Sequence, residues 1–524
     1  MTGLIVLPIL LPALVAPFLI LALGYDLRAQ RIASIGATLL FLALAAMLYG
    51  LAGDGTPRTY RLGDWPAPFG IVLVLDRLAA TMLVLTGVLA SVVVVHAAAG
   101  WDARGRHFHP LFQFQLMGLA GAFLTGDVFN LFVFFEVMLI ASYGLMLHGG
   151  GAERMKAGFQ YVALNLVAST LFLFAVGLLY AVTGTLNIAD LAVKATQVPA
   201  GDRALLTVGA ALLAMVFALK AAAVPLHWWL PAAYPAASAP AAALFMVMTK
   251  VGIYALIRVH GLAFPDLAAP WLTAAGLLGL AIGAIGALAA RRLAELVAYG
   301  VVWSMGGLLV ALAVMGAASA VDSAGTMTGS GVAAGTAVLY YAVHSTLAGA
   351  ALFLLAGLVA AARGSLADRL VPGGPPLGTG PALLFLLAAI GFTGLPPLSG
   401  FLGKVMILQA TAGDPHRVAI WSLLIGSGLP VMIGFARAGS TLFWKTAGAE
   451  GVEPAATGPA RVEPPGRTGL ATVALLVAAL AGLTVLAGPI TGHLGATARQ
   501  MADRAGTVEA VLGEPGGRGR ETAR

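Results

Sequence analysis

The chain has 524 residues, of which 60% are apolar and only 10% are charged, and its mean hydropathy is +0.94. A hydropathy this high excludes a water-soluble globular protein of this length and indicates a membrane protein. The sequence contains no cysteine, which excludes disulfides, thiolate-held iron–sulfur clusters and covalently attached c-type haem, and its net charge of +7 is spread over loops rather than gathered into a nucleic-acid-binding patch.

Runs of about 20 apolar residues, the length that crosses a hydrocarbon core of ~30 Å, follow one another along the chain. The first run lacks a basic segment before it and is longer than a signal-peptide core, so we expect it to be retained. The Pro-, Gly- and Glu-rich stretches at 446–468 and from 512 are predicted to be flexible. In chain order, the fourteen predicted spans cover residues 3–23, 32–52, 71–97, 110–126, 128–148, 158–182, 204–236, 240–262, 270–290, 294–316, 332–361, 381–411, 417–443 and 469–490.

Basic residues gather on alternate loops. The positive-inside rule therefore predicts that both termini lie on the outer face of the membrane. The opposite loops hold fewer basic residues. The basic residues on the predicted inner loops are Arg28, Arg31, Arg104, Arg106, Arg154, Lys156, Arg291, Arg292, Arg363, Arg369, Arg437 and Lys445.

Five ionisable residues lie near the centres of predicted spans: Glu136, Lys220, Lys250, His344 and Lys404. An unpaired charge at such a depth costs between ~2.5 and ~17 kcal/mol, so these groups must be paired, hydrated or neutral. Three lysines with one carboxylate and one histidine at similar depth favour a connected proton relay. The alternatives are lysines that snorkel or fasten helices, a glutamate in an ion pair that only fixes helix register, and a histidine that is a core residue.

Two of the predicted spans are interrupted by proline. Pro225 should break the seventh span just after Lys220, and Pro396 and Pro397 should break the twelfth shortly before Lys404. The offset of five spans is odd, so it inverts the second copy relative to the first and predicts an inverted-topology repeat. The predicted units are a three-helix region at 1–109, a first repeat at 110–262 (spans four to eight), a second repeat at 263–445 (spans nine to thirteen), a loop at 446–468, a final span at 469–490 and a tail at 491–524.

Unwound backbone at the depth of these breaks requires cover by protein or water, so we expect a hydrated interior in which Glu136 pairs with Lys220. His227, two residues after Pro225, is either a structural residue or a relay member. Asp76, at the start of the third span, is expected to form an interfacial ion pair with its neighbour Arg77.

Four stretches, "NLFVFFEVMLIASYGLML", "LKAAAVPLHWWLPAAYPAASAP", "MTKVGIYALIR" and "GLPPLSGFLGK", resemble the antiporter-like membrane subunits of respiratory complex I and of the Mrp multisubunit sodium/proton antiporters. The resemblance covers about residues 65–445, and the stretch around the glutamate is most similar to the D-type subunits of the Mrp group. It implies fourteen helices with two inverted five-helix bundles. It also implies that Glu136, Lys220, Lys250, His344 and Lys404 are the proton relay.

The sequence departs from this pattern in the tenth span, "LVAYGVVWSMGGLL", where relatives carry more serine and a glutamine or histidine. Here Ser304 remains and Met305 takes a polar position, which puts the hydrated link through the second repeat in question.

The resemblance implies a proton-translocating subunit of a multisubunit monovalent cation (Na⁺)/proton antiporter in a bacterial plasma membrane. Its partners would be the large A-type subunit of an Mrp complex and small membrane subunits, with no cofactor, metal or nucleic acid. One alternative is a proton-pumping subunit of complex I or of a membrane-bound hydrogenase, and another is a non-conducting scaffold whose charges fix register. An enzyme is not expected, because no nucleophile–base pair or metal-ligand spacing is present in the sequence.

Overall fold

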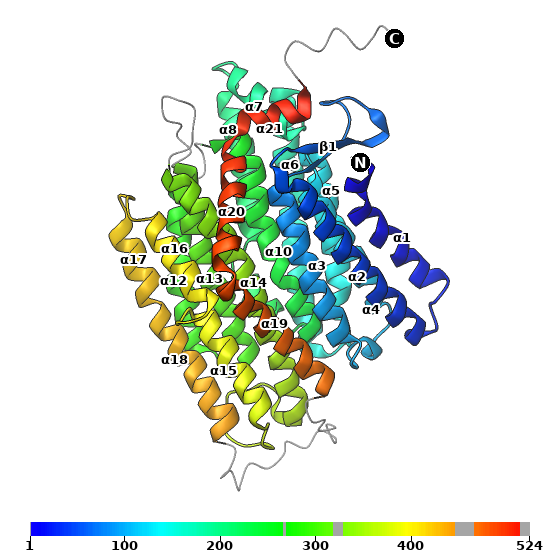
Figure 1. Cartoon of the computed structure of the whole chain (residues 1–524), viewed down its shortest axis with the longest axis vertical. Coiled ribbons are helices and arrows are strands. Elements are labelled where there is room, and N and C mark those ends of the chain that lie inside the picture. The colour runs from blue at the N-terminus through cyan, green and yellow to red at the C-terminus, as the bar shows by residue number, and fades with distance from the viewer. Residues whose placement is uncertain (1, 266–268, 318–328, 446–465, 514–524) are drawn as a thin grey trace.

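The computed structural model describes residues 2–265, 269–317, 329–445 and 466–513 as a bundle of helices that run mostly along its long axis (Figure 1). Within these residues, twelve helices are long and apolar enough to cross a membrane. The other two predicted spans correspond to α4, which has 17 residues, and to the broken pair α15 and α16. The predicted all-α membrane fold is therefore confirmed.

The helices that correspond to the predicted spans are α1 Leu7–Leu21, α2 Leu27–Leu51, α3 Arg77–Ala97, α4 Phe108–Leu124, α5 Val128–Leu147, α6 Ala152–Thr183, α8 Arg203–Lys220, α10 Ala239–Ala255, α12 Ala269–Ala289, α13 Leu293–Ala317, α14 Gly329–Arg363, α15 Thr379–Thr393, α16 Ser399–Ala410, α17 Arg417–Gly426, α18 Gly428–Gly439 and α19 Arg467–Val485. The other α-helices are α7 Ile188–Gln197, α9 Trp229–Ala233, α11 Gly261–Ala263, α20 Ala487–Ala502 and α21 Arg504–Leu512, and the antiparallel strands are β1 Arg58–Arg61 and β2 Val72–Leu75. Short 3-10 and π-helical turns lie between some of these elements.

Polar side chains mark where several helices begin. Asp26, Asp76, Asp127 and Asn187 accept hydrogen bonds from the first backbone N–H groups of α2, α3, α5 and α7. These groups have no partner within the helix itself, so each cap fixes the boundary between a helix and its preceding loop.

Three segments differ from the sequence prediction. The third span begins at Arg77 rather than 71, because the apolar residues 72–75 form the buried strand β2 instead of a helical turn. Residues 188–197 form the amphipathic helix α7, which is too short and too polar to be detected as a span. Residues 487–512, assigned mostly to a tail, form α20 and α21, and α20 packs along α14. Most of the predicted flexible loop, 446–465, and the tail from 514 lie outside the residues described.

Both predicted breaks are present. Helix α8 ends at Lys220, and the chain runs through turns over 221–228 before α9 begins. Helix α15 ends at Thr393, and α16 begins at Ser399 after five non-helical residues. In both places proline cannot donate the backbone hydrogen bond that would continue the helix.

A matching pair of glycines in α4 and α12 shows how the two repeats use the same packing. Gly118 and Gly121 in α4 lie against Met138 and Phe134 of α5, where any Cβ would clash. In α12 and α13, Gly283 lies against Trp303 and Gly286 against Tyr299, and all four positions follow their counterparts by 165 residues. By this correspondence Glu136 matches the apolar Val301, so only the first repeat carries a carboxylate at that place.

The predicted inner loops lie at one end of the bundle. Arg31 forms an ion pair with Asp102 at 2.6 Å, and Arg292 contacts both Asp368, at 2.9 Å, and Glu153, at 3.4 Å. These pairs join the loops after the first, third, fifth, ninth and eleventh spans. The strands, α7 and α21 gather at the opposite end, near the start of α1 (Figure 1). The alternation of loops that the basic residues predict is thus present in the tertiary structure.

Candidate functional site: a polar chain across the middle of the bundle

Helix α6 separates Glu136 from Lys220 instead of letting them meet. Glu136 of α5 accepts a hydrogen bond from the hydroxyl of Ser169, and the Lys220 ammonium donates to Oδ1 of Asn165 at 2.7 Å. Asn165 and Ser169 are one helical turn apart on α6, so they lie on the same face. The expected contact ion pair is therefore wrong in this conformation: a serine and an asparagine stand between the two charges.

The break after Lys220 places its charge at the carboxyl end of a helix. Lys220 is the last residue of α8, and the carboxyl end of a helix carries a partial negative charge that favours a cation. Leu219 O at this end accepts two hydrogen bonds, from Ala222 N and from Nε1 of Trp229, each at 3.0 Å. Helix α10 passes close by, because a Cβ at Gly252 would lie only 2.6 Å from the backbone of Phe217 and Ala221.

Lys250 lies in α10, which is buried along its whole length. Its side chain is enclosed, and within the part of the chain that the structure describes its Nζ has no hydrogen-bond partner. A buried ammonium without a partner is costly, so it requires water, or it gives up its proton.

Lys250 and His344 lie at about the same depth in the bundle. Helices α10 and α14 are neighbours that run in opposite directions, and the side chain of Met246 packs over Gly349. From that contact, Lys250 is four residues and His344 five residues toward the end of the bundle that carries the strands, or about 6 and 7.5 Å by helical rise. The two groups thus occupy one level of adjacent helices.

His344 joins α14 to the second broken helix. Its Nδ1 lies 2.9 Å from Oγ of Ser399, the first residue of α16, and the two form a hydrogen bond. A Cβ at Gly400 would lie only 2.8 Å from Nε2 of His344, so glycine is required for this approach. The imidazole is therefore held directly at the start of the second half-helix.

Lys404 folds back across the second break. Its Nζ donates to Thr393 O, at the end of α15, at 2.6 Å, and lies 4.1 Å from the centre of the Trp303 ring. Trp303 is fixed by a hydrogen bond from its Nε1 to Ser427 at 2.7 Å. The ammonium of Lys404 thus lies at the carboxyl end of the half-helix α15, as Lys220 lies at the carboxyl end of α8. A cavity of about 300 Å³ adjoins it, lined by residues of α16, α17 and α18.

The other predicted site residues lie apart from the polar chain formed by the five ionisable residues and their hydrogen-bond partners. Pro225 and the pair Pro396 and Pro397 lie in the breaks and are exposed on the bundle surface. His227 is half-buried with its Nδ1 unpartnered among the described residues, and no hydrogen bond within them joins it to a lysine. Ser304 donates to Val301 O of its own helix, so its hydroxyl does not extend the chain.

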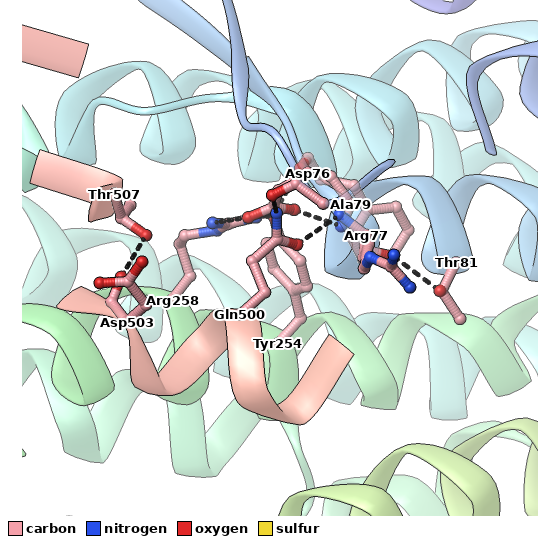
Figure 2. A network of polar contacts seen from close by, with 11 residues as sticks. Asp76, Arg77, Ala79, Thr81, Tyr254, Arg258, Gln500, Asp503 and Thr507 are labelled. Carbon is pink, nitrogen blue, oxygen red and sulfur yellow. Dashed lines mark hydrogen bonds and ion pairs between the residues drawn. The ribbon is translucent and has the colours of Figure 1, made fainter. Parts of the chain in front are cut away.

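The expected pair of Asp76 and Arg77 is wrong. Asp76 forms its ion pair with Arg258, 182 residues away, at 2.5 Å (Figure 2). Arg77 instead donates to the carbonyl of Gly53. Adjacent residues at the start of a helix point in different directions, and the buried guanidinium of Arg258 is the nearer partner for a buried carboxylate.

Sequence reasoning missed the neutral members of the chain. Asn165 and Ser169 contact the two charges of the first repeat, and Ser399 and Trp303 contact those of the second. A signal was available for the first pair, because two polar residues at a spacing of four fall inside an apolar span. For Ser399 and Trp303 only the tertiary structure shows the contact.

Residues 125–430 match the family described as "NADH:quinone oxidoreductase/Mrp antiporter, TM". The chain belongs to this family. It is 41% identical to a probable K⁺/H⁺ antiporter D subunit of Rhizobium meliloti over 98% of both chains, and 35% identical to a Na⁺/H⁺ antiporter D subunit of Bacillus subtilis over 85% of this chain and 87% of that one.

Solved structures agree with this assignment. The fold is similar to a chain of the Mrp complex from Dietzia sp., with a TM-score of 0.84 and 28% identity over 98% of this chain and all of that one. It is also similar to a chain of respiratory complex I from Thermus thermophilus, with a TM-score of 0.75 and 25% identity over 95% of this chain and 99% of that one. The protein is thus a multi-pass membrane member of the NADH:quinone oxidoreductase/Mrp antiporter family.

Proposed function

We propose that this chain is the proton-translocating membrane subunit of a multisubunit antiporter that exchanges a monovalent cation for protons, a transporter subunit rather than an enzyme. The observation that carries the proposal is the ammonium of Lys250, partnerless among the described residues and enclosed at the depth of His344, next to the break that follows Lys220. The names of the relatives, potassium in one and sodium in another, support a monovalent cation without fixing which one.

The geometry supports an electrostatic relay. With Lys220 on Asn165 and Glu136 on Ser169, the charges of the first pair are held apart. A swing of the Lys220 side chain by one turn along α6, toward Ser169, would bring it to Glu136 and stabilise its proton. The swing back would release the proton toward Lys250. From there His344 and Lys404 continue the path across the second repeat.

The energies involved are of matching size. Moving one charge across the membrane changes the free energy by ~2.3 kcal/mol per 100 mV. A hydrogen bond to a charged group contributes ~1.5–3 kcal/mol. Exchanging the partner of a single lysine is therefore enough to open or close one proton-transfer step.

Partner subunits belong to the same proposal. Both breaks expose backbone and apolar residues at mid-span, including Trp228 and Leu395, and such backbone is tolerated in a membrane only under protein or water. Similarity to a chain of an Mrp complex supports neighbours of that kind, namely the large A-type subunit and small membrane subunits. We place the assembly in the plasma membrane of a bacterium, as its relatives' organisms suggest.

The test is neutralisation of one relay lysine. Lys250→Ala in the assembled complex should abolish cation-driven proton flux in inside-out vesicles, and Lys220→Ala and Glu136→Ala should do the same. Lys194→Ala is the matched control, because Lys194 is a half-exposed lysine paired with Asp190 at the outer end. Normal flux in Lys250→Ala, with the partners still co-purifying, would favour the scaffold alternative and refute the relay.

A proton-pumping subunit of a redox complex is the second candidate, favoured by the similarity to a complex I chain. Co-purification separates the two functions. Small membrane subunits without redox subunits support the antiporter, whereas iron–sulfur subunits support the pump.

A further inference from the structure

The outer end of α10 carries a buried polar network that the relay does not use. Arg258 donates to both carboxylate oxygens of Asp76, at 2.5 and 2.8 Å, and to the hydroxyl of Tyr254 at 2.9 and 3.0 Å. The Tyr254 hydroxyl in turn donates to Phe123 O of α4 at 2.5 Å. Figure 2 shows the side chains of Asp76, Arg258 and Tyr254 meeting beside Gln500 of α20.

This network covers the face of α10 that carries Lys250. Lys250, Tyr254 and Arg258 follow one another at intervals of four residues, so all three lie on one side of the helix. By helical rise, Tyr254 is about 6 Å and Arg258 about 12 Å nearer the outer end than Lys250. A proton moving between Lys250 and the outer face along this side would meet both.

The helix widens where Arg258 lies. Residues Leu256–His260 form a π-helical turn, a local distortion that is frequent at functional sites. The turn directs Arg258 to Asp76 on one side, while His260 contacts the backbone of Ala210 in α8, the helix that ends at Lys220. The network is thus linked to two helices that carry relay lysines.

Water can reach the network from the outer end of the bundle. A cavity of about 40 Å³, enough for a water molecule, lies at the ion pair and is lined partly by Gln500 and Thr507. On its inner side the Tyr254 ring is 2% exposed and packs edge-on against Phe123, with ring centres 5.0 Å apart. Helix α20 is fixed against the network by Gln500, which accepts a hydrogen bond from Arg77 N and donates one to Gly55 O.

We propose that Asp76, Arg258 and Tyr254 form an outer seal that isolates Lys250 from the outer face. Arg258 occupies this route with a guanidinium that cannot release its proton, so it does not pass protons inward. Asp76 and the Tyr254 hydroxyl hold the guanidinium in place. With this route closed, the proposed path of a proton from Lys250 runs sideways, toward His344 and the cavity beside Lys404.

The seal rests on the proposed function, since it has a role only if Lys250 carries protons. The test measures passive proton leak into proteoliposomes containing the complete complex, after an acid pulse in choline salts without sodium or potassium. Asp76→Asn removes the charge but keeps an oxygen to cap α3, and Tyr254→Phe keeps the ring but removes the hydroxyl. Asp54→Asn, which neutralises an exposed carboxylate paired with Arg58 at the same end, is the control.

We expect both seal variants to leak about tenfold faster than the wild type, the change in rate that the loss of one charge-assisted hydrogen bond produces. Asp54→Asn should leave the leak unchanged, and adding Lys250→Ala to Asp76→Asn should remove the extra leak. Leak at the control rate in Tyr254→Phe, or in an assembled Asp76→Asn complex, overturns the seal. If Lys250→Ala instead leaves cation-driven flux intact, the proposed function fails, whatever the leak.

Discussion

Asn165 offers the sharpest test of the relay, because it touches Lys220 without being ionisable itself. Its Oδ1 accepts from the ammonium at 2.7 Å, and its Nδ2 donates to Tyr161 O at 2.8 Å, so the amide is held in one orientation. Asn165→Leu removes the acceptor and leaves the protonated lysine without ~1.5–3 kcal/mol of stabilisation. Asn165→Asp adds a carboxylate at the same place, and at the 2.7 Å separation its attraction is about 6 kcal/mol for an effective dielectric constant of about 20, before the cost of burying it.

The two variants should move the pH profile of cation-driven proton flux in opposite directions. In Asn165→Leu the lysine gives up its proton more readily, so the profile shifts about one to two units toward acid. In Asn165→Asp the proton is held more tightly, so the profile shifts toward alkaline pH and the maximal rate falls. The assay is flux in inside-out vesicles over a range of pH, with subunit co-purification as the check on assembly. Shifts in the same direction, or none, would show that the charge state of Lys220 does not limit transport.

Three further predictions concern residues around the site and at the two ends of the bundle. Burial alone would raise the pKa of Asp102, but hydrogen bonds from His109 and Arg31 hold that pKa at about 2. The ionised carboxylate therefore stabilises the fold above pH ~4, and this stabilisation is lost as the pH falls toward 2. Asp102→Asn should lower the free energy of unfolding by about 2 kcal/mol near neutral pH, which a lower melting temperature in detergent would show. Burial raises the pKa of Asp127 to about 6, so ionisation of this carboxyl group destabilises the fold increasingly from pH ~4 to 6 and fully above pH 6. Asp127→Asn should therefore raise the melting temperature at pH 8 but not at pH 4. Equal effects at both pH values would contradict the raised pKa. Gly394→Ala should slow flux by distorting Lys404, since Gly394 has φ +75° and a Cβ there would lie 2.8 Å from Lys404 Cε, whereas Gly380→Ala, with open space at its Cβ, should leave flux unchanged.

The helices and the breaks could be predicted from the sequence because their causes are local. The length of an apolar run decides whether it can cross the bilayer, and proline ends a helix because it removes a backbone hydrogen-bond donor. Hydropathy failed where apolar character serves another purpose: Val72–Leu75 is a buried strand, and α20 extends the chain beyond the last span as a helix packed on α14.

Pairing between charges could not be predicted in the same way. From the sequence we predicted that Glu136 pairs with Lys220 and Asp76 with Arg77. In the structure, Glu136 contacts Ser169 and Lys220 contacts Asn165, both on α6, and Asp76 pairs with Arg258. Which side chains meet depends on the rotation and register of each helix, and these are set by close contacts such as Gly252 against α8 and Gly400 against His344.

The sequence by itself thus determined the membrane class, the alternation of loops and the depth of each ionisable group, because hydropathy, positive charge and helical rise act along the chain. Only the tertiary structure decided that Lys250 lies level with His344, that Lys220 and the ammonium of Lys404 both lie at the carboxyl ends of half-helices, and that Arg258 pairs with Asp76. Those facts follow from packing between segments far apart in the sequence, where a rotation of one helix by a single residue would turn each group to a different neighbour.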